Sequence, residues 1–549
     1  MLIYFCSSLI FPPSTWNERT ASTAAATATK RVPRIYIIYT YLLHLPGGAF
    51  NLNCPMRRIL VALLPSVLAA ASVTATAASD AAPAPPQRRR RLLQRLVQVQ
   101  VVHRHGDRTP ITPMKDEAYW RSNLPEAHVL EGIARGTNLR RDGGGADCQQ
   151  GQNPHAAGGR GPFGQLTSLG LLQMISLGGR LREELVHSGQ GQGQGGEEHQ
   201  RAAESRGDKL FDADGGAGVN LHPSRIAVTS TDFPRTIQSV QGLLVGLLPD
   251  GTDQDPVEID VRHTDRMIPD PQPRGTAEQV ELEKILARRP HLASREVEMK
   301  ELADRATEAL RDMLGEGYGD IVFGVGEEGG GSGSGSGSGS SRPLSWSQLA
   351  EITTCLRTRG LLPGALTEAD HEAISSHAAW RWFENLRHPR LARLAMHGMV
   401  ASIMEALRRT AAGDVSEDEP RLRIYSAHDS TLIGLLCAFH LDQPSQWPEY
   451  ASYLRTDLIE VEVDADTDAE EVDPSARKGY YVRFSLNGEV LHSSWSRTEV
   501  DGDEHPELRD LIPLDLLTEM TEMEHRDDEI AVMAASAAAA ADPPDHDGI

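Results

Sequence analysis

Short apolar runs that fit β-strands alternate with longer runs of helical period along most of the chain. Residues 96–102 alternate apolar side chains with Gln98 and Gln100, a pattern that predicts a strand covered on one face. Residues 225–230 and 421–426 are similar short runs. Thr167 is the expected N-cap of a helix whose apolar residues recur every three or four positions. This alternation predicts an α/β fold.

Each of these predicted strands leads into a loop that carries chemically reactive side chains. The first leads to Arg-His-Gly-Asp-Arg-Thr-Pro at residues 104–110, the second to Arg235, and the third to His428 and Asp429. In open α/β sheets, ligands bind beyond the carboxyl ends of the strands, where helix N-termini add N–H donors for anions. The loops are therefore expected to converge on one site for an anionic ligand.

The first loop places an imidazole between two guanidinium groups. Arg104 and Arg108 can hold a phosphate dianion by forked hydrogen bonds while His105 attacks phosphorus. Arg235 adds a cation of the kind that stabilises a transferring phosphoryl group. His103, two residues before His105, is expected to have a structural role.

The third loop joins a second imidazole to a carboxyl group. His428 can donate a hydrogen bond to bound phosphate, and Asp429 can protonate the departing alcohol and later help to activate water. An apolar wall, or the charge of bound phosphate, is expected to raise the pKa of Asp429 and favour its role as an acid. Asp429 can at the same time serve as the N-cap of a helix that begins near Ser430.

These motifs resemble those of the histidine acid phosphatases, the second branch of the histidine phosphatase superfamily. The resemblance rests on Arg-His-Gly-x-Arg-x-Pro with a distal His-Asp, on residues 228–236, and on Leu-Thr-x-x-Gly-x-x-Gln at residues 166–173. It implies an acid phosphatase with a phosphoglycerate-mutase-like three-layer α/β/α core, an inserted α-helical cap, and no metal or other cofactor. The implied catalytic residues are His105 as nucleophile and Asp429 as proton donor, and the implied phosphate-binding residues are Arg104, Arg108, Arg235 and His428.

The class of phosphomonoester stays open at this point. Residues 447–451, 481–484 and 513–515 resemble the lysophosphatidic acid phosphatase branch, and Asp107 at the variable motif position resembles general acid phosphatases more than phytases. Trp380, Trp382 and Phe383 have the helical spacing typical of a core, although contact with a lipid or aryl substrate is the alternative. A formal net charge of −23 argues against a nucleic-acid partner and does not favour inositol polyphosphates. An inactive phosphoanion-binding scaffold is the alternative of another class.

Composition shifts divide the chain into segments. The predicted segments are an N-terminal extension at 1–79, the first part of the α/β core at 92–254, a helical cap at 255–412 with a disordered Gly/Ser insert at 329–341, the second part of the core at 413–522, and a disordered acidic and Ala-rich tail at 523–549. Five cysteines exclude a dense disulfide framework, and Cys437 is expected to be a small buried hydrophobic residue.

The N-terminal extension has features of a targeting peptide. Met56 is followed by two arginines, an apolar run at 59–71 and small residues at 75–79, which predicts a signal peptide and the secretory pathway, either secretion or a lysosome-like or vacuole-like compartment. The alternative is a transit peptide for the mitochondrion or another organelle, because residues 1–79 contain Glu18 as their single acidic residue. No run of membrane-spanning length follows residue 79, so no integral membrane segment is expected in the mature chain. The oligomeric state is left open.

Overall fold

The computed structural model describes eleven parts of the chain. These are residues 92–141, 161–187, 209–212, 221–248, 255–262, 267, 276–315, 343–413, 419–463, 478–496 and 508–522. The predicted N-terminal extension at 1–79, the Gly/Ser insert at 329–341 and the tail at 523–549 lie outside these residues. Among the residues that the structure describes, no helix is long and apolar enough to cross a membrane.

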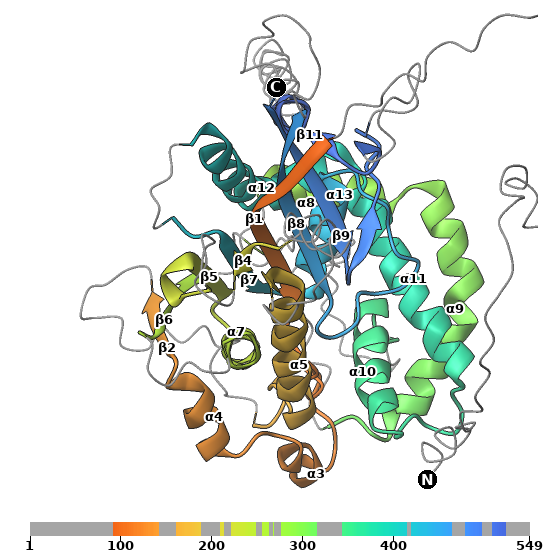
Figure 1. The fold of residues 1–549 in the computed structure, drawn as a ribbon. Coiled ribbons are helices and arrows are strands. Elements are labelled where there is room, and N and C mark those ends of the chain that lie inside the picture. The colour runs from red at the N-terminus through yellow and green to blue at the C-terminus, as the bar shows by residue number, and fades with distance from the viewer. Residues whose placement is uncertain are drawn as a thin grey trace, which may run out of the picture. The chain divides into compact units, whose positions relative to one another are not determined.

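A mixed β-sheet of nine strands forms the centre of the described structure (Figure 1). Its strands are β1 (Leu92–Arg104), β2 (Thr137–Arg141), β5 (Ile226–Thr231), β6 (Val257–Arg262), β7 (Leu422–Ala427), β8 (Tyr453–Val463), β9 (Lys478–Leu486), β10 (Glu489–Leu491) and β11 (Ile512–Pro513). Their order is β10-β9-β8-β1-β7-β5-β6-β2, and β11 pairs with β9. The strands from β1 to β2 in this order are parallel, whereas β8, β9, β10 and β11 pair antiparallel. The short strands β3 (Val186–His187) and β4 (Phe211–Asp212) pair separately.

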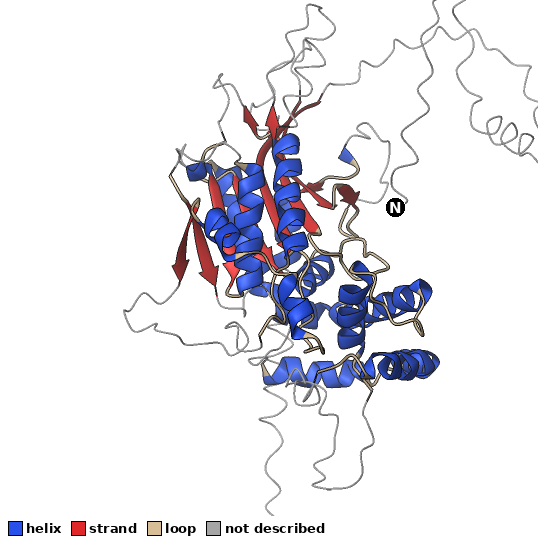
Figure 2. Cartoon of the chain, turned by 90° about the horizontal axis from the view of Figure 1, so that it is seen from below, coloured by secondary structure: helices blue, strands red, loops and turns tan. Residues whose placement is uncertain are grey.

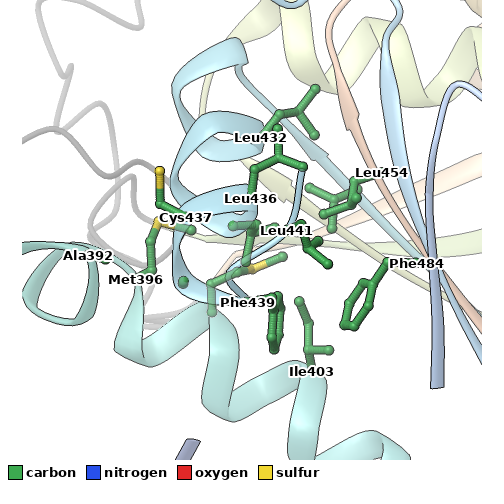
Figure 3. Close-up of a cluster of buried hydrophobic side chains, with 14 of the residues drawn as sticks. Ala392, Met396, Ile403, Leu432, Leu436, Cys437, Phe439, Leu441, Leu454 and Phe484 are labelled. Carbon is green, nitrogen blue, oxygen red and sulfur yellow. The ribbon is translucent and has the colours of Figure 1, made fainter. Parts of the chain in front are cut away.

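Helices cover both faces of this sheet. Helices α5 (Ser168–Leu185) and α7 (Pro234–Leu247) share one apolar cluster with Val99 and Val101 of β1. Helices α12 (Pro389–Ala412) and α13 (Asp429–Ala438) share another cluster with the opposite face, where Ile403, Leu436 and Phe484 lie close together (Figure 3). The predicted α/β fold is therefore confirmed, with helical layers on both sides of the strands.

The strand predicted at residues 96–102 is part of β1, but it is covered on both faces. Gln98 and Gln100 are fully buried, and their side-chain amides donate hydrogen bonds to the backbone carbonyls of Ala406 at 3.3 Å and Ile403 at 3.0 Å in α12. Buried polar groups are tolerated when they are hydrogen-bonded in this way. The prediction that one face of this strand is uncovered is therefore wrong.

A group of helices, called the helical cap below, packs beside the sheet, as Figure 2 shows. Its members are α3 (Glu117–Ser122), α9 (Pro290–Arg311), α10 (Trp346–Thr358) and α11 (Glu368–Leu386), which share a third apolar cluster. Two further helices are α4 (Ala127–Ala134) and α8 (Ala277–Ala287). The predicted cap boundary at residue 255 is wrong, because β6 lies in the main sheet. The predicted end at residue 412 is also wrong, because α12 covers the sheet. Helical period alone does not tell which surface a helix covers.

Candidate active site

The loops that follow β1, β5 and β7 meet at one edge of the sheet. β7 lies between β1 and β5, and the last residues of β1 and β7, Arg104 and Ala427, are paired in register. His105 and His428 therefore leave neighbouring strands at the same level, and their ring centroids are 5.6 Å apart. Phe233, which precedes Arg235 at the start of α7, has its ring centroid 5.0 Å from that of His428. The structure thus brings together the reactive side chains of all three loops.

The His105 side chain has a defined tautomer. Its Nδ1 atom lies 2.8 Å from the backbone carbonyl oxygen of Gly106, and a carbonyl oxygen only accepts, so Nδ1 carries the proton and Nε2 has a free lone pair. Burial, together with the positive charges of Arg235 and Arg104, lowers the pKa of His105 well below its ordinary value. His105 is therefore a neutral imidazole with its basic nitrogen at Nε2.

Arg104 and Arg108 are each held by hydrogen bonds from the guanidinium group. Arg104 donates from Nη1 to the carbonyl oxygen of Pro448 and places its charge 4.1 Å from the centroid of the Tyr450 ring. Arg108 donates from Nη1 to Glu351 Oε1 at 2.6 Å and to its neighbouring carbonyl oxygen, that of Thr109, at 3.1 Å. Both cations are therefore oriented by contacts from other parts of the chain.

The Nε atoms of Arg104, Arg108 and Arg235 are buried and have no hydrogen-bond partner among the described residues. Arg235 stacks on Phe233, with 4.4 Å between the guanidinium carbon and the ring centroid, and its pKa is lowered to about 9 by burial and by the positive charge of Arg108. Buried N–H donors without an acceptor are costly and uncommon in proteins. Their common position beside His105 is chemically suited to an anion with several oxygens.

His428 and Asp429 lie at the N-terminus of α13. His428 occupies the N-cap position, and its Nε2 is 3.0 Å from Thr231 Oγ1 at the end of β5. Burial and the charge of Arg235 lower the pKa of His428 well below its ordinary value. Asp429 is the first helical residue rather than the N-cap, and its Oδ1 accepts from the backbone N–H of Ser430 at 2.8 Å.

The carboxyl group of Asp429 is held in its ionised form. Burial favours the neutral form, but Arg104 Nη2 at 2.8 Å and the indole Nε1 of Trp447 at 2.7 Å both contact Oδ2, and together they lower the pKa of Asp429 below its ordinary value. The expectation that an apolar wall raises the pKa of Asp429 is wrong for this structure, whereas the expected effect of bound phosphate stays a prediction. The neighbouring wall is an indole that presents its N–H edge to the carboxylate, and a cation lies on the other side.

The Thr, Gly and Gln residues of the segment at 166–173 each contact the loop that carries His105, and these contacts account for their spacing. Thr167 caps α5 and donates from Oγ1 to Asp107 Oδ2 at 2.5 Å, and Gln173 Oε1 accepts from the backbone N–H of Asp107 at 2.8 Å. A Cβ on Gly170 would lie 2.0 Å from the carbonyl oxygen of Asp107, and one on Gly106 would lie 2.2 Å from that of Gly170. The Leu-Thr-x-x-Gly-x-x-Gln pattern is therefore the docking surface for this loop.

Asp107 joins the loop to the helical cap. It is fully buried, and its Oδ2 is 2.6 Å from Nη2 of Arg359, the residue that follows α10. Glu351, from the middle of α10, accepts from the backbone N–H of Ile111 at 2.7 Å as well as from Arg108. Glu351 and Arg359 were missed from the sequence because they belong to no recognisable motif. Trp447 and Tyr450 lie in the segment at 447–451, whose family resemblance did not indicate a place in the site.

The remaining candidate residues are structural. His103 is fully buried, and burial lowers its pKa to about 4. Phe383 belongs to the core, Trp382 packs on its edge, and Trp380 stacks on His377 with ring centroids 5.5 Å apart. Burial raises the pKa of the Cys437 thiol to about 12, in agreement with the predicted role as a small hydrophobic residue.

Comparison with known proteins adds a family relationship to this geometry. The sequence matches the histidine phosphatase superfamily (branch 2) over residues 95–284 and 362–487, which is more than half of its 549 residues. It is 26% identical to counting factor 60 of Dictyostelium discoideum over 408 residues, which cover 72% of this chain and 80% of that protein. A protein of the same organism named as a probable acid phosphatase is 24% identical over 421 residues, with 74% of this chain and 76% of that protein covered. The phytase structure from Citrobacter braakii aligns with 13% identity and a TM-score of 0.46, and the alignment covers 78% of this chain and 98% of the phytase.

Proposed function

Because this chain belongs to branch 2 of the histidine phosphatase superfamily, it is a phosphatase, and we propose that it hydrolyses phosphate monoesters through a covalent phosphohistidine at His105. The observation that carries this proposal is the set of buried, unpartnered Nε–H groups of Arg104, Arg108 and Arg235 beside a neutral imidazole. Such donors match the oxygens of a phosphoryl group, and a neutral imidazole is the form that attacks phosphorus. The proposed substrate is a small-molecule phosphomonoester.

In the first step, the three arginines and His428 bind the phosphate oxygens. His105 Nε2 attacks phosphorus, the bond from phosphorus to the alcohol oxygen breaks, and Asp429 transfers its proton to that oxygen. The new N–P bond leaves positive charge on the imidazole ring, and the Nδ1–H bond to the carbonyl oxygen of Gly106 stabilises this charge. The products of the step are a free alcohol and a phosphohistidine.

In the second step, water enters where the alcohol left. Asp429, now a carboxylate, takes a proton from the water, the water oxygen attacks phosphorus, and the N–P bond breaks. Inorganic phosphate departs and His105 returns to its neutral form. The same carboxyl group thus donates a proton in one step and accepts one in the next.

Substrate binding favours uptake from the solvent of the proton that Asp429 needs for the first step. In the structure, Arg104 Nη2 contacts Asp429 Oδ2, and the positive charge of Arg104 lowers the pKa of this carboxyl group. A phosphate dianion competes for the same guanidinium and adds negative charge near Asp429. Both effects raise the pKa of Asp429 in the complex and promote its protonation at acid pH.

The experiment that tests the proposal is the trapping of the phosphoenzyme. Protein mixed with labelled p-nitrophenyl phosphate at acid pH in the presence of a chelator, then quenched in alkali, is expected to carry label on the peptide that contains His105. The His105→Ala variant is expected to lose both label and turnover. The matched control is His128→Ala, because the His128 side chain is 75% exposed on α4 and pairs with the exposed Glu126. Turnover by His105→Ala, or phosphate binding by the natural protein without turnover, would refute the mechanism, and the second result would favour the inactive scaffold.

A panel of p-nitrophenyl phosphate, lysophosphatidate and phytate tests the class of alcohol. The strongly acidic chain is expected to hydrolyse phytate most slowly, since a substrate with several phosphates requires a basic surround. Fastest turnover of phytate would favour an inositol-polyphosphate phosphatase, and fastest turnover of lysophosphatidate would favour a lysophosphatidic acid phosphatase.

We also propose that the chain enters the secretory pathway, on the basis of the signal-peptide pattern between residues 56 and 79. N-terminal sequencing of the mature protein tests this proposal. A mature N-terminus shortly after residue 79, in protein recovered from the secretory pathway, is the expected result. Recovery from mitochondria or another organelle would support the alternative of a transit peptide.

A further inference from the structure

The segment at residues 447–452 contacts both halves of the candidate active site. Trp447 Nε1 donates to Asp429 Oδ2 at 2.7 Å, and the carbonyl oxygen of Pro448 accepts from Arg104. The backbone N–H of Ala451 donates to the carbonyl oxygen of His105 at 3.2 Å, and the carbonyl oxygen of Ser452 accepts from the backbone N–H of Arg104 at 2.8 Å. The segment is thereby fixed to the end of β1 and to the start of α13 at the same time.

Trp447 differs from the other contact of Asp429 Oδ2. Arg104 also belongs to the phosphate site, so bound phosphate competes with Asp429 for its guanidinium group. The Trp447 indole carries no charge and has a single N–H donor, which is already directed at Asp429. We expect this contact to remain when phosphate binds.

The Trp447 ring is itself held by packing. It is partly buried between the apolar cluster of α12 and α13 and the cluster of the helical cap, and it meets Trp382 edge to face with ring centroids 5.7 Å apart. A donor fixed in this way holds an acceptor in one orientation without reorganising during the reaction. The Asp429 carboxyl group is consequently fixed at Oδ1 by the backbone of α13 and at Oδ2 by Trp447.

We propose that Trp447 is a positioning residue that holds the carboxyl group of Asp429 for proton donation to the leaving oxygen, an inference that rests on the proposed role of Asp429 as the acid. The remaining lone pair of Oδ2, which contacts Arg104 in the structure, carries the proton once that guanidinium turns to phosphate. Loss of the indole N–H leaves the acid present and able to ionise, with a less defined direction of proton transfer. Misplacement of a catalytic group by a small distance is enough to slow a reaction strongly.

The test compares leaving groups that differ in their need for a proton. The Trp447→Phe variant keeps an aromatic ring and loses the donor. Its kcat/KM for an alkyl monoester such as glycerol 2-phosphate is expected to fall about tenfold or more, whereas kcat/KM for p-nitrophenyl phosphate stays within about twofold, because p-nitrophenolate leaves without a proton. The quantity kcat/KM covers only the steps up to phosphohistidine formation, so slow hydrolysis of the phosphoenzyme does not obscure the result.

The matched control is Trp495→Phe, which changes an indole that packs on the apolar cluster of α12 and α13. The Trp495 ring stacks on His440, which follows the C-terminal end of α13, with ring centroids 4.5 Å apart. This variant is expected to change both kcat/KM values by the same small factor. If Trp447→Phe does not fold, replacement of Trp447 by benzothienylalanine removes only the N–H and permits the same comparison.

Equal losses for both substrates, or no loss for the alkyl ester, would overturn the role of Trp447. Trapping of the phosphoenzyme separates this outcome from failure of the proposed function. Labelled His105 in the natural protein together with equal losses in Trp447→Phe refutes only the positioning role. Absence of label at His105 in the natural protein refutes the mechanism and the positioning role together.

Discussion

The ion pair between Asp107 and Arg359 is expected to be the most sensitive link between the catalytic loop and the cap. Asp107 is fully buried, and the Arg359 side chain is 7% exposed, with Nη2 2.6 Å from Asp107 Oδ2. Arg359 also donates from Nη1 to the carbonyl oxygen of Cys355 at 2.8 Å. The Arg359→Met substitution keeps the length and apolar contacts of the side chain and removes the charge.

Among the residues that the structure describes, this substitution leaves Asp107 with one side-chain donor, the hydroxyl group of Thr167, at 2.5 Å. A buried carboxylate that loses its cation typically costs about 3–5 kcal/mol of unfolding free energy. The matched control is Arg357→Met in the last turn of α10, because Arg357 pairs with Glu368 at the surface, where the side chains are 46% and 65% exposed. An exposed pair of this kind contributes about 0–1 kcal/mol.

Urea unfolding at pH 7, followed by circular dichroism, measures both variants, and the double variant Asp107→Asn with Arg359→Met completes a mutant cycle. Neutralising both partners is expected to recover part of the loss, because no uncompensated charge then remains buried. A loss below about 1 kcal/mol for Arg359→Met, or an equal loss for Arg357→Met, would show that burial of Asp107 does not control the stability of this link.

Three further predictions concern packing, pH and thiol reactivity. Gly178→Ala is expected to cost about 1–3 kcal/mol of unfolding free energy, because its Cβ would lie 2.0 Å from a carbonyl oxygen of α7. A Cβ at Gly179 would meet no atom within 4 Å, so Gly179→Ala should stabilise α5 by up to about 1 kcal/mol. Thermal unfolding compares the two variants. The pKa of His103 is about 4 in the folded protein and 6.5 when unperturbed, so the unfolded chain takes up the proton first and stability falls as the pH drops from 6.5 toward 4. His103→Asn should therefore lose about 2–3 kcal/mol less than the natural protein between pH 7 and pH 4.5, measured by urea midpoints, and equal losses would contradict this. Burial raises the pKa of the Cys355 and Cys437 thiols to about 12, so peptide mapping should find both unmodified by iodoacetamide at pH 8 in the folded protein and modified in urea.

The parts of the fold that were predictable are those that local pattern determines. The strands before His105, Arg235 and His428 have short apolar runs, and α5 begins at its predicted cap, Thr167. The loops converge because parallel strands present their carboxyl ends at one edge, which follows from the α/β pattern alone. Strand β6 was missed although its six residues alternate strictly between apolar and charged side chains, because the segment that follows it is dominated by helical period.

The residues that hold the site in place could not be predicted, because tertiary packing alone brings them there. Glu351 and Arg359 pair with Arg108 and Asp107 across more than 240 residues of sequence, and nothing near either residue resembles a binding motif. Both also lie between the two ranges matched by the family, 95–284 and 362–487. The motif residues thus depend on partners from a part of the chain that the family match does not include. It follows that the effect of a substitution at Asp107 or Arg108 cannot be read from the motif alone, since the cap helix α10 determines whether the charge left behind is compensated.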